Sequence, residues 1–245
     1  MKLLVATALL ALATPFAAHA QSAESAITAG LADPSRPEAD RARDASRHPA
    51  EVLAFAGVKP GDKVGDFVMG GGYWSRIVAT AVGPNGHVYG YQPAEFAKYA
   101  DPNAKPLSDT YANVTVSMVP GADFAFPEPL DIIFTFENWH DLHTPAFATP
   151  DFGKVAARKL YDSLKPGGVL IVADHVANAD PGMKAPDTLH RIDPAAARAD
   201  VESAGFVYDG ELPVLRNPAD DHSLTVFDKA IRGKTDQFVY RFRKP

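Results

Sequence analysis

Residues 63–76 read KVGDFVMGGGYWSR, and this stretch decides the fold. A short apolar segment ends near an acidic residue, three consecutive glycines follow, and an amphipathic segment begins directly after them. The first part favours a buried β-strand and the last part a helix, because the spacing of the apolar residues changes between them. Glycines allow a sharp turn and a close approach of a ligand to the backbone. The stretch therefore predicts a strand–loop–helix unit of an α/β protein.

The rest of the chain continues this alternation of strand and helix. Helices are predicted at residues 48–58, 73–83, 151–164 and 194–206, and strands at 63–68, 86–92, 113–119, 130–136, 169–175, 206–216 and 237–245. This order predicts a doubly wound, mostly parallel, seven-stranded sheet with helices on both faces. The last two strands have no helix between them, which predicts an antiparallel hairpin at the C-terminal edge. Ligands of such folds bind beyond the carboxyl ends of the parallel strands.

Composition excludes several classes of function. The chain has 245 residues, a formal net charge of −6 and no cysteine. Disulfides, thiolate nucleophiles, iron–sulfur clusters and thiolate zinc sites are therefore excluded. The acidic balance gives no excess of positive charge for binding nucleic acid, so no nucleic-acid partner is expected.

The N-terminal sequence predicts an export signal, which the folded part of the chain follows. Residues 1–20 combine Lys2, an apolar run and Ala18-His19-Ala20, which predicts a cleavable export signal cut after Ala20. We therefore expect a periplasmic or secreted protein with no membrane span in the mature chain. Residues 21–48 are predicted to form a loose N-terminal arm with one short helix at most, and residues 49–245 a single domain.

The glycine loop offers a site for a polar ligand. Gly70, Gly71 and Gly72 precede a helix that starts at Tyr73, and the free N–H groups of a helix N-terminus carry partial positive charge. Asp66, at the end of the strand, could accept hydrogen bonds from an amine or hold the loop through its backbone. The alternative is that the glycines serve only the packing of the strand against the helix.

Several motifs carry a family resemblance. They are DKVGDFVMGGGYWSR, HVYGYQP, LDIIFTFENWHDLH, LKPGGVLIVADH, LHRIDPAAARADVESAGF and TDQFVYRFRKP. On these motifs, residues 36–245 resemble a class I S-adenosylmethionine-dependent methyltransferase, and more narrowly its exported branch of predicted methyltransferases. The resemblance implies a Rossmann-like methyltransferase fold, S-adenosylmethionine as cofactor, and transfer of a methyl group to a small molecule.

The resemblance also implies which residues contact the cofactor. They are Asp66, Gly70, Gly71, Gly72, Tyr73, Gln92, Asp123 and Asn138. The chain departs from the family pattern at two positions. Val68 stands where the first glycine of the loop is expected, and Gln92 stands where a carboxylate usually holds the ribose hydroxyls. An amide can still bond a hydroxyl, without the assistance of charge, and Glu95 is close enough in sequence to substitute.

Histidines and carboxylates gather after the fourth and fifth predicted strands. Histidine titrates near neutral pH and suits the removal of a proton from an acceptor. We predict His140 as the base with Asp141 orienting it, and the catalytic set is His140, Asp141, His175 and His190. The first alternative is a divalent metal bound by His140, His143, Asp174 and His175. The second is a structural role, as for Asp193, which precedes Pro194 like the N-cap of a helix.

Two functions remain open from the sequence. Tyr73, Trp74 and Trp139 flank the predicted crevice, where aromatic faces either attract a sulfonium or form core. The first function is an exported methyltransferase acting on a small molecule. The second is a binding or metal-dependent protein that kept this fold and lost the cofactor, which Val68 and Gln92 motivate.

Overall fold

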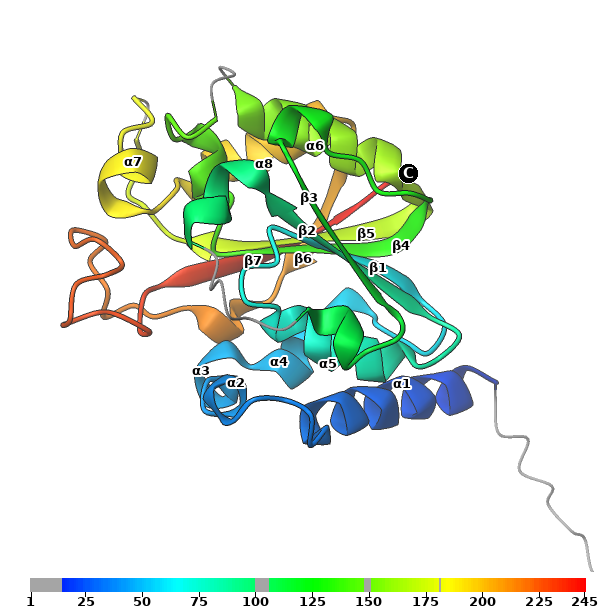
Figure 1. Ribbon diagram of the computed structural model, residues 1–245. Helices are drawn as coiled ribbons and strands as arrows, with labels where there is room; N and C mark the ends of the chain where they lie inside the picture. Colours follow the sequence, from blue (N-terminus) through cyan, green and yellow to red (C-terminus); the bar gives the residue numbers. More distant parts are fainter. Residues whose placement is uncertain (1–14, 100–105, 148–150, 181) are drawn as a thin grey trace, which may run out of the picture.

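A computed structural model describes residues 15–99, 106–147, 151–180 and 182–245. Most of the predicted export signal, residues 1–14, lies outside the described residues. The centre of the fold is one sheet in the order β3-β2-β1-β4-β5-β7-β6 (Figure 1). Its strands are β1 Lys63–Phe67, β2 His87–Pro93, β3 Val114–Val119, β4 Leu130–Phe136, β5 Leu164–His175, β6 Val207–Glu211 and β7 Gln237–Arg243.

The strand directions confirm the predicted sheet. Strands β1 to β5 run parallel to one another, and β7 pairs antiparallel with both β5 and β6. The antiparallel edge is therefore present, with β7 inserted between β5 and β6. The chain order reverses between β1 and β4, where a ligand crevice is expected in a sheet of this kind.

Helices cover both faces of the sheet. Helices α4 Pro49–Ala56 and α5 Tyr73–Val82 lie on one face, and α6 Phe152–Ser163 and α8 Pro194–Ser203 lie on the other (Figure 1). Each face has its own cluster of buried apolar side chains. The Asp193 side chain accepts the Ala195 N–H at 2.8 Å, so the predicted N-cap of α8 is confirmed.

Short helices fill the connections. They are α2 Glu38–Arg41, α3 Asp44–Arg47, η1 Ala94–Tyr99, η2 Leu107–Asp109, η3 Gly121–Asp123, η4 His140–His143, α7 Ala185–Leu189 and η5 Pro213–Leu215. Within the described part of the chain, no helix combines the length and the apolar character that crossing a membrane requires.

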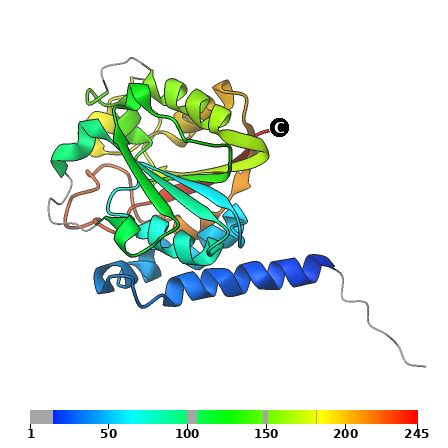
Figure 2. The same cartoon turned by 45° about the vertical axis from the view of Figure 1, so that its right-hand side comes forward.

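The prediction of a loose N-terminal arm is wrong. Helix α1 Pro15–Ala32 packs along α5 on the underside of the molecule (Figure 2). A Cβ atom at Gly30 would lie 2.4 Å from the carbonyl oxygen of Ile77, so the two helices touch where only glycine fits. Ile27 is buried in the same interface. The predicted cleavage point after Ala20 falls within α1.

Ion pairs hold the segment that follows α1. Asp40 accepts a hydrogen bond from Arg76 of α5 at 2.7 Å, and the fully buried Arg36 pairs with Asp44 at 2.6 Å. These contacts use few apolar side chains, which explains why the polar sequence suggested a loose arm. They place α3 against the end of the sheet that carries the glycine loop.

Candidate functional site

The glycine loop divides into an open part and a packed part. A Cβ atom at Gly70 or Gly71 would meet no atom within 4 Å, whereas one at Gly72 would lie 2.7 Å from the Leu107 side chain. Gly70 and Gly72 have positive φ values of 54° and 79°. The open space at Gly70 and Gly71 fits close approach of a ligand, and Gly72 serves packing.

Side chains at the ends of β2 and β4 hold this loop. The Gly70 N–H donates to Oε1 of Gln92 at 3.0 Å, and Nδ2 of Asn138 donates to the Val68 carbonyl at 3.1 Å. Val68 has a φ of 61°, an unfavourable value for a β-branched residue. Both Gln92 and Asn138, predicted as cofactor contacts, thus bond the loop backbone, and the carboxamide oxygen of Gln92 is engaged there.

Asp66 lies beneath the loop. Its carboxylate is buried and accepts the Ser75 hydroxyl at 2.6 Å, which ties the end of β1 to the first turn of α5. Burial raises the pKa of Asp66 to about 6, against smaller opposing effects of the Ser75 bonds and the charge of Arg47. Asp66 therefore ties β1 to α5 through Ser75, whereas the prediction was a bond to the backbone N–H groups of the loop.

Two further predicted cofactor contacts lie farther from the loop. Asp123 is exposed in η3. The Glu95 carboxylate accepts the Gly121 N–H at 3.0 Å. Glu95 thus anchors the start of η3.

The aromatic residues take different roles. The Tyr73 hydroxyl donates to Asp44 at 2.6 Å. The Trp74 ring stacks on Phe136 with ring centroids 4.0 Å apart. Trp139 is fully buried in the core on the other face of the sheet, so it takes the core role that was the alternative to a place beside the crevice.

A first cavity of about 250 Å³ adjoins the glycine loop. The ends of β1 and β4 form its walls, together with two arginines from the N-terminal segment. Its lining comprises Arg43, Arg47, Asp66, Val68, Met69, Gly70, Gly71, Tyr73, Trp74, Phe136, Glu137, Asn138 and Asp141. Sequence reasoning missed the two arginines and Glu137; the only signal was the run of charged residues between positions 36 and 47.

A histidine–carboxylate pair occupies the ends of β4 and β5. Nδ1 of His140 lies 2.8 Å from Asp174, and the backbone N–H of His140 donates to the same carboxylate at 2.7 Å. Asp174 is fully buried. Burial alone would lower the pKa of His140, but the Asp174 charge raises it above the ordinary value. The prediction that Asp141 orients His140 is wrong, because Asp174 does so.

Two other predicted catalytic residues face the same ring. Nε2 of His140 lies 3.4 Å from Oδ1 of Asp141, and Nδ1 of His190 lies 3.8 Å from the same oxygen. Burial raises the pKa of Asp141 and lowers that of His190. His175 is buried beside them, with Nδ1 2.7 Å from the Thr235 hydroxyl. Burial lowers its pKa as well.

The predicted set of metal ligands is not brought together. His143 points away, with Nε2 2.8 Å from Asp200 on α8. Asp174 is engaged by His140 and by the backbone N–H of His175. Among the described residues, the group with ligand atoms close enough for one ion is His140, Asp141 and His190, all within 4.8 Å of one another.

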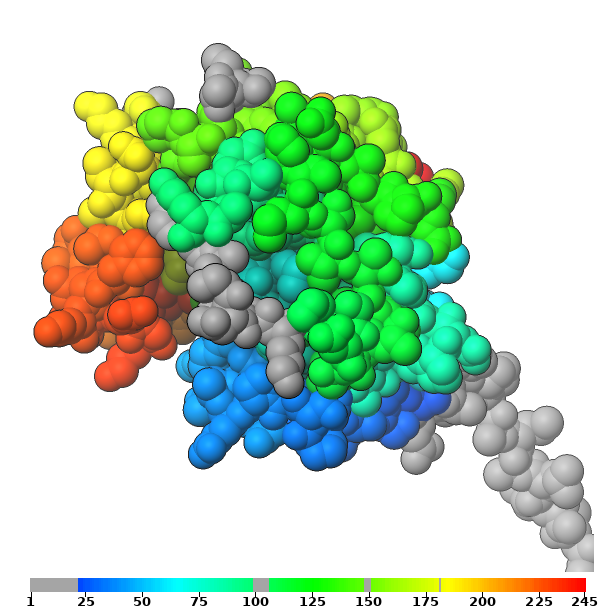
Figure 3. Space-filling model, viewed as in Figure 1, coloured from blue at the N-terminus to red at the C-terminus, as the bar shows by residue number. Residues whose placement is uncertain are grey.

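A second, larger cavity of about 840 Å³ lies over these histidines. Apolar side chains and carboxylates share its wall. The loop between β6 and β7 forms part of the wall, and its atoms are orange in Figure 3, beside the yellow atoms of α7. It is lined by Gln92, Glu95, Phe96, Lys98, Glu137, His140, Asp141, Thr144, Pro145, Ala146, His175, Asp187, His190, Val226 and Phe227. Glu137 and Asp141 line both cavities, so the two adjoin.

Among the described residues, three of the seven non-glycine residues with a positive φ line these two cavities. Val68, Glu137 and His190 have φ values of 61°, 59° and 54°, in the left-handed region that non-glycine residues rarely adopt. All three line one or both cavities. Such strain persists where the surrounding structure fixes the backbone, and it is frequent at functional sites.

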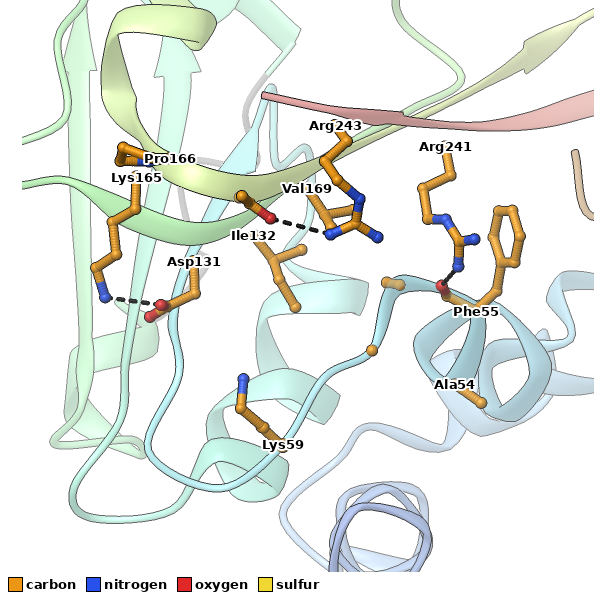
Figure 4. A pocket seen from close by; sticks show the side chains of 14 residues that line it. Ala54, Phe55, Lys59, Asp131, Ile132, Lys165, Pro166, Val169, Arg241 and Arg243 are labelled. Carbon is orange, nitrogen blue, oxygen red and sulfur yellow. Dashed lines mark hydrogen bonds and ion pairs between the residues drawn. The ribbon is translucent and has the colours of Figure 1, made fainter. Parts of the chain in front are cut away.

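A third cavity, of about 360 Å³, lies at the opposite end of the strands. It is rich in cations, but contacts within the chain engage them (Figure 4). Lys165 pairs with Asp131 at 2.7 Å, and Arg241 donates to the Phe55 carbonyl at 2.8 Å. The carboxyl ends of the strands therefore remain the better candidate for a site.

Comparisons with known proteins agree with this fold. A structure described as a SAM-dependent methyltransferase from Aquifex aeolicus superposes with a TM-score of 0.56 at 20% identity, covering 91% of this chain and 98% of that one. A putative sarcosine dimethylglycine methyltransferase from Galdieria sulphuraria gives 0.57 at 15% identity, covering 83% and 85%. The fold is that of the class I methyltransferases. Neither a family model nor a curated protein sequence matches the chain.

Two other solved structures define what this likeness implies. Fibrillarin from Aeropyrum pernix, in complex with natively bound S-adenosyl-L-methionine, gives a TM-score of 0.50 at 16% identity, covering 82% of this chain and 76% of that one. The cyclase SpnF gives 0.56 at 15% identity, covering 91% and 93%. One fold thus carries proteins described by different reactions, so the chemistry must be argued from the site.

Proposed function

We propose that the protein transfers a methyl group from S-adenosylmethionine to a small-molecule acceptor. The observation that carries this proposal is the pair of adjoining cavities at the carboxyl ends of the strands. One cavity lies beside an open glycine loop, and the other lies over a histidine held by a buried carboxylate. The methyltransferase fold agrees with this assignment.

The first cavity suits the methyl donor. Gly70 and Gly71 leave space for a ligand against the backbone, and the ring of Trp74 lines the same cavity. An aromatic face attracts a sulfonium cation. When bound, S-adenosylmethionine supplies an electrophilic methyl group. The amide hydrogens of Gln92 remain suited to a ribose hydroxyl, because its oxygen already accepts the Gly70 N–H.

The second cavity suits the acceptor. Its volume of about 840 Å³ lies in the usual range for small-molecule sites, about 300–1,000 Å³. Phe96, Val226 and Phe227 give it an apolar side, and His140 with Asp141 gives it a polar side. An acceptor with a hydroxyl or an ammonium group beside an apolar portion fits this lining.

His140 would remove the proton from the acceptor. Asp174 accepts the Nδ1–H of His140, which leaves Nε2 directed to Asp141 and the cavity. The buried carboxylate stabilises the imidazolium that forms and so strengthens the base. Methyl transfer itself is an in-line displacement, so the remaining task of the chain is to hold donor and acceptor in line.

Binding of S-adenosylhomocysteine, measured by calorimetry, tests the donor site. We expect saturable binding to the wild type and its loss in Gly71→Val, whose side chain would enter the open space of the first cavity. Gly71 has no positive φ and no close neighbour, so the variant should fold. Gly182→Val is the matched control, since Gly182 also has room and lines neither cavity. A wild type that binds nothing at millimolar ligand would contradict the proposal.

A divalent metal at His140, Asp141 and His190 is a second candidate. The proximity of their ligand atoms favours it, and Asp174 would orient the His140 ring as carboxylates do for metal-bound histidines. Metal analysis of protein purified without chelator tests it. A metal that is present in the wild type and lost in His190→Ala would mean that His140 is a ligand rather than the base.

A further inference from the structure

We propose that Arg47 and Glu137 form a clamp for the α-amino-acid end of the methyl donor. The proposal rests on the proposed function and extends it to a segment that the sequence presented as a loose arm. Arg47 is the last residue of α3, and Glu137 follows β4. Nη2 of Arg47 lies 2.6 Å from Oε2 of Glu137, and both side chains line the first cavity.

The pair has the chemistry that an amino acid requires. A free α-amino acid carries one carboxylate and one ammonium group. A guanidinium binds a carboxylate through two parallel N–H bonds, and a carboxylate accepts the bonds of an ammonium. Arg47 and Glu137 are 20% and 29% exposed, so both are partly shielded from water and still reachable.

Surrounding contacts hold both groups in place. The Arg47 guanidinium lies over the Tyr73 ring, 4.9 Å from its centroid, and Tyr73 is fixed through its hydroxyl by Asp44. The other oxygen of Glu137 accepts Nε2 of Gln237 at 3.2 Å. Each partner therefore keeps its own support if the ion pair opens to admit a zwitterion.

The position of the pair favours the methyl donor, rather than the acceptor, as its ligand. Arg47 lines the cavity that contains Gly70 and Gly71, and the residues of the second cavity do not include it. Glu137 lines both cavities, at their junction. An amino-acid group held here would lie beside the glycine loop, with the rest of the donor following the open backbone.

Calorimetry with two probes tests the clamp. S-adenosylhomocysteine carries the amino-acid end, and 5′-methylthioadenosine lacks it. We expect Arg47→Met to weaken binding of the first probe about 10- to 100-fold, as for the loss of charged hydrogen bonds. The dissociation constant of the second probe should change less than about 2-fold. Arg47→Lys, which keeps the charge, should lie between the wild type and Arg47→Met.

The control is Arg198→Met. Arg198 also pairs with a glutamate and lies over a tyrosine ring, but it is remote from both cavities. It should bind both probes as the wild type does. If Arg47→Met weakens both probes equally, or neither, the clamp is refuted while the donor site stands. If the wild type binds neither probe, the proposed function itself fails.

Discussion

Replacing Asp66 by asparagine should make the free protein more stable at neutral pH. Asp66 is 4% exposed, and the pKa of its carboxyl group rises from 3.8 to about 6 because burial disfavours the charged form. At about 1.4 kcal/mol for each pH unit, this rise corresponds to about 3 kcal/mol. Asparagine has the same shape and can still accept the Ser75 hydroxyl.

The sign follows from proton binding. Between pH 3.8 and about 6 the folded state holds the Asp66 proton more tightly than the unfolded state, so stability falls as pH rises through this window. Below this window Asp66 is protonated in both the folded and the unfolded state. Above it Asp66 is charged in both, and the full loss of unfolding free energy has occurred. Asp66→Asn lacks this loss, so the free energy of unfolding of the variant should exceed that of the wild type by up to about 3 kcal/mol at pH 7.5.

The assay is urea unfolding at several pH values from 4 to 8, without ligand. For a domain of this size the gain at pH 7.5 corresponds to about 6–12 °C in Tm. Asp131→Asn is the matched control with the opposite sign. Burial raises the pKa of Asp131, but bonds to Lys165 and to the Lys63 N–H outweigh burial and hold this pKa below its ordinary value. Replacing the Asp131 carboxylate should therefore lower the free energy of unfolding at neutral pH. A difference between wild type and Asp66→Asn that is flat with pH would refute the reasoning.

Three further predictions concern the histidine pair, the N-terminal packing and export. Asp174→Asn should lower the pKa of His140 and move the acidic limb of the pH–rate profile to lower pH. It should also reduce kcat/KM by about 10²-fold or more; an unchanged profile would contradict the pairing. Gly30→Ala should cost about 1–3 kcal/mol of unfolding free energy, because the added Cβ meets the Ile77 carbonyl, and a Tm equal to that of the wild type would contradict the packing. We also propose that the exported protein begins at Gln21, which mass spectrometry of material from the cell envelope would show; an intact Met1 would contradict it.

The sequence was sufficient for the sheet because its signals are local. Apolar runs such as residues 130–136 identify strands, and glycines and prolines end the helices. The rule that ligands bind beyond strand ends then placed Gly70, His140 and His190 at the carboxyl ends of the strands, where the structure has them. These steps need the order of elements along the chain, without knowledge of which side chains touch.

The errors arose where distant contacts decide. His143 and His140 are equivalent in the sequence pattern, but Asp200, on a helix much later in the chain, pairs with His143 and draws it out of the site. Asp141 follows His140 directly in the sequence and was predicted to orient it, but Asp174, at the buried end of β5, lies 2.8 Å from Nδ1 of His140 and does so instead. Helix α1 was missed because small residues and few large apolar ones, such as Gly30 and Ile27, form its contact with α5. Helices α2 and α3 were missed because ion pairs hold them.

Different segments of the chain build the two cavities, and the loop between β6 and β7 belongs only to the larger one. Strand ends and helix α5 build the cavity beside the glycines, whereas this loop brings Val226 and Phe227 to the larger cavity. Loops tolerate sequence change far better than the strands that they connect. A change confined to this loop would therefore reshape the part of the larger cavity beside Val226 and Phe227 and leave the lining of the cavity at the glycine loop as it is.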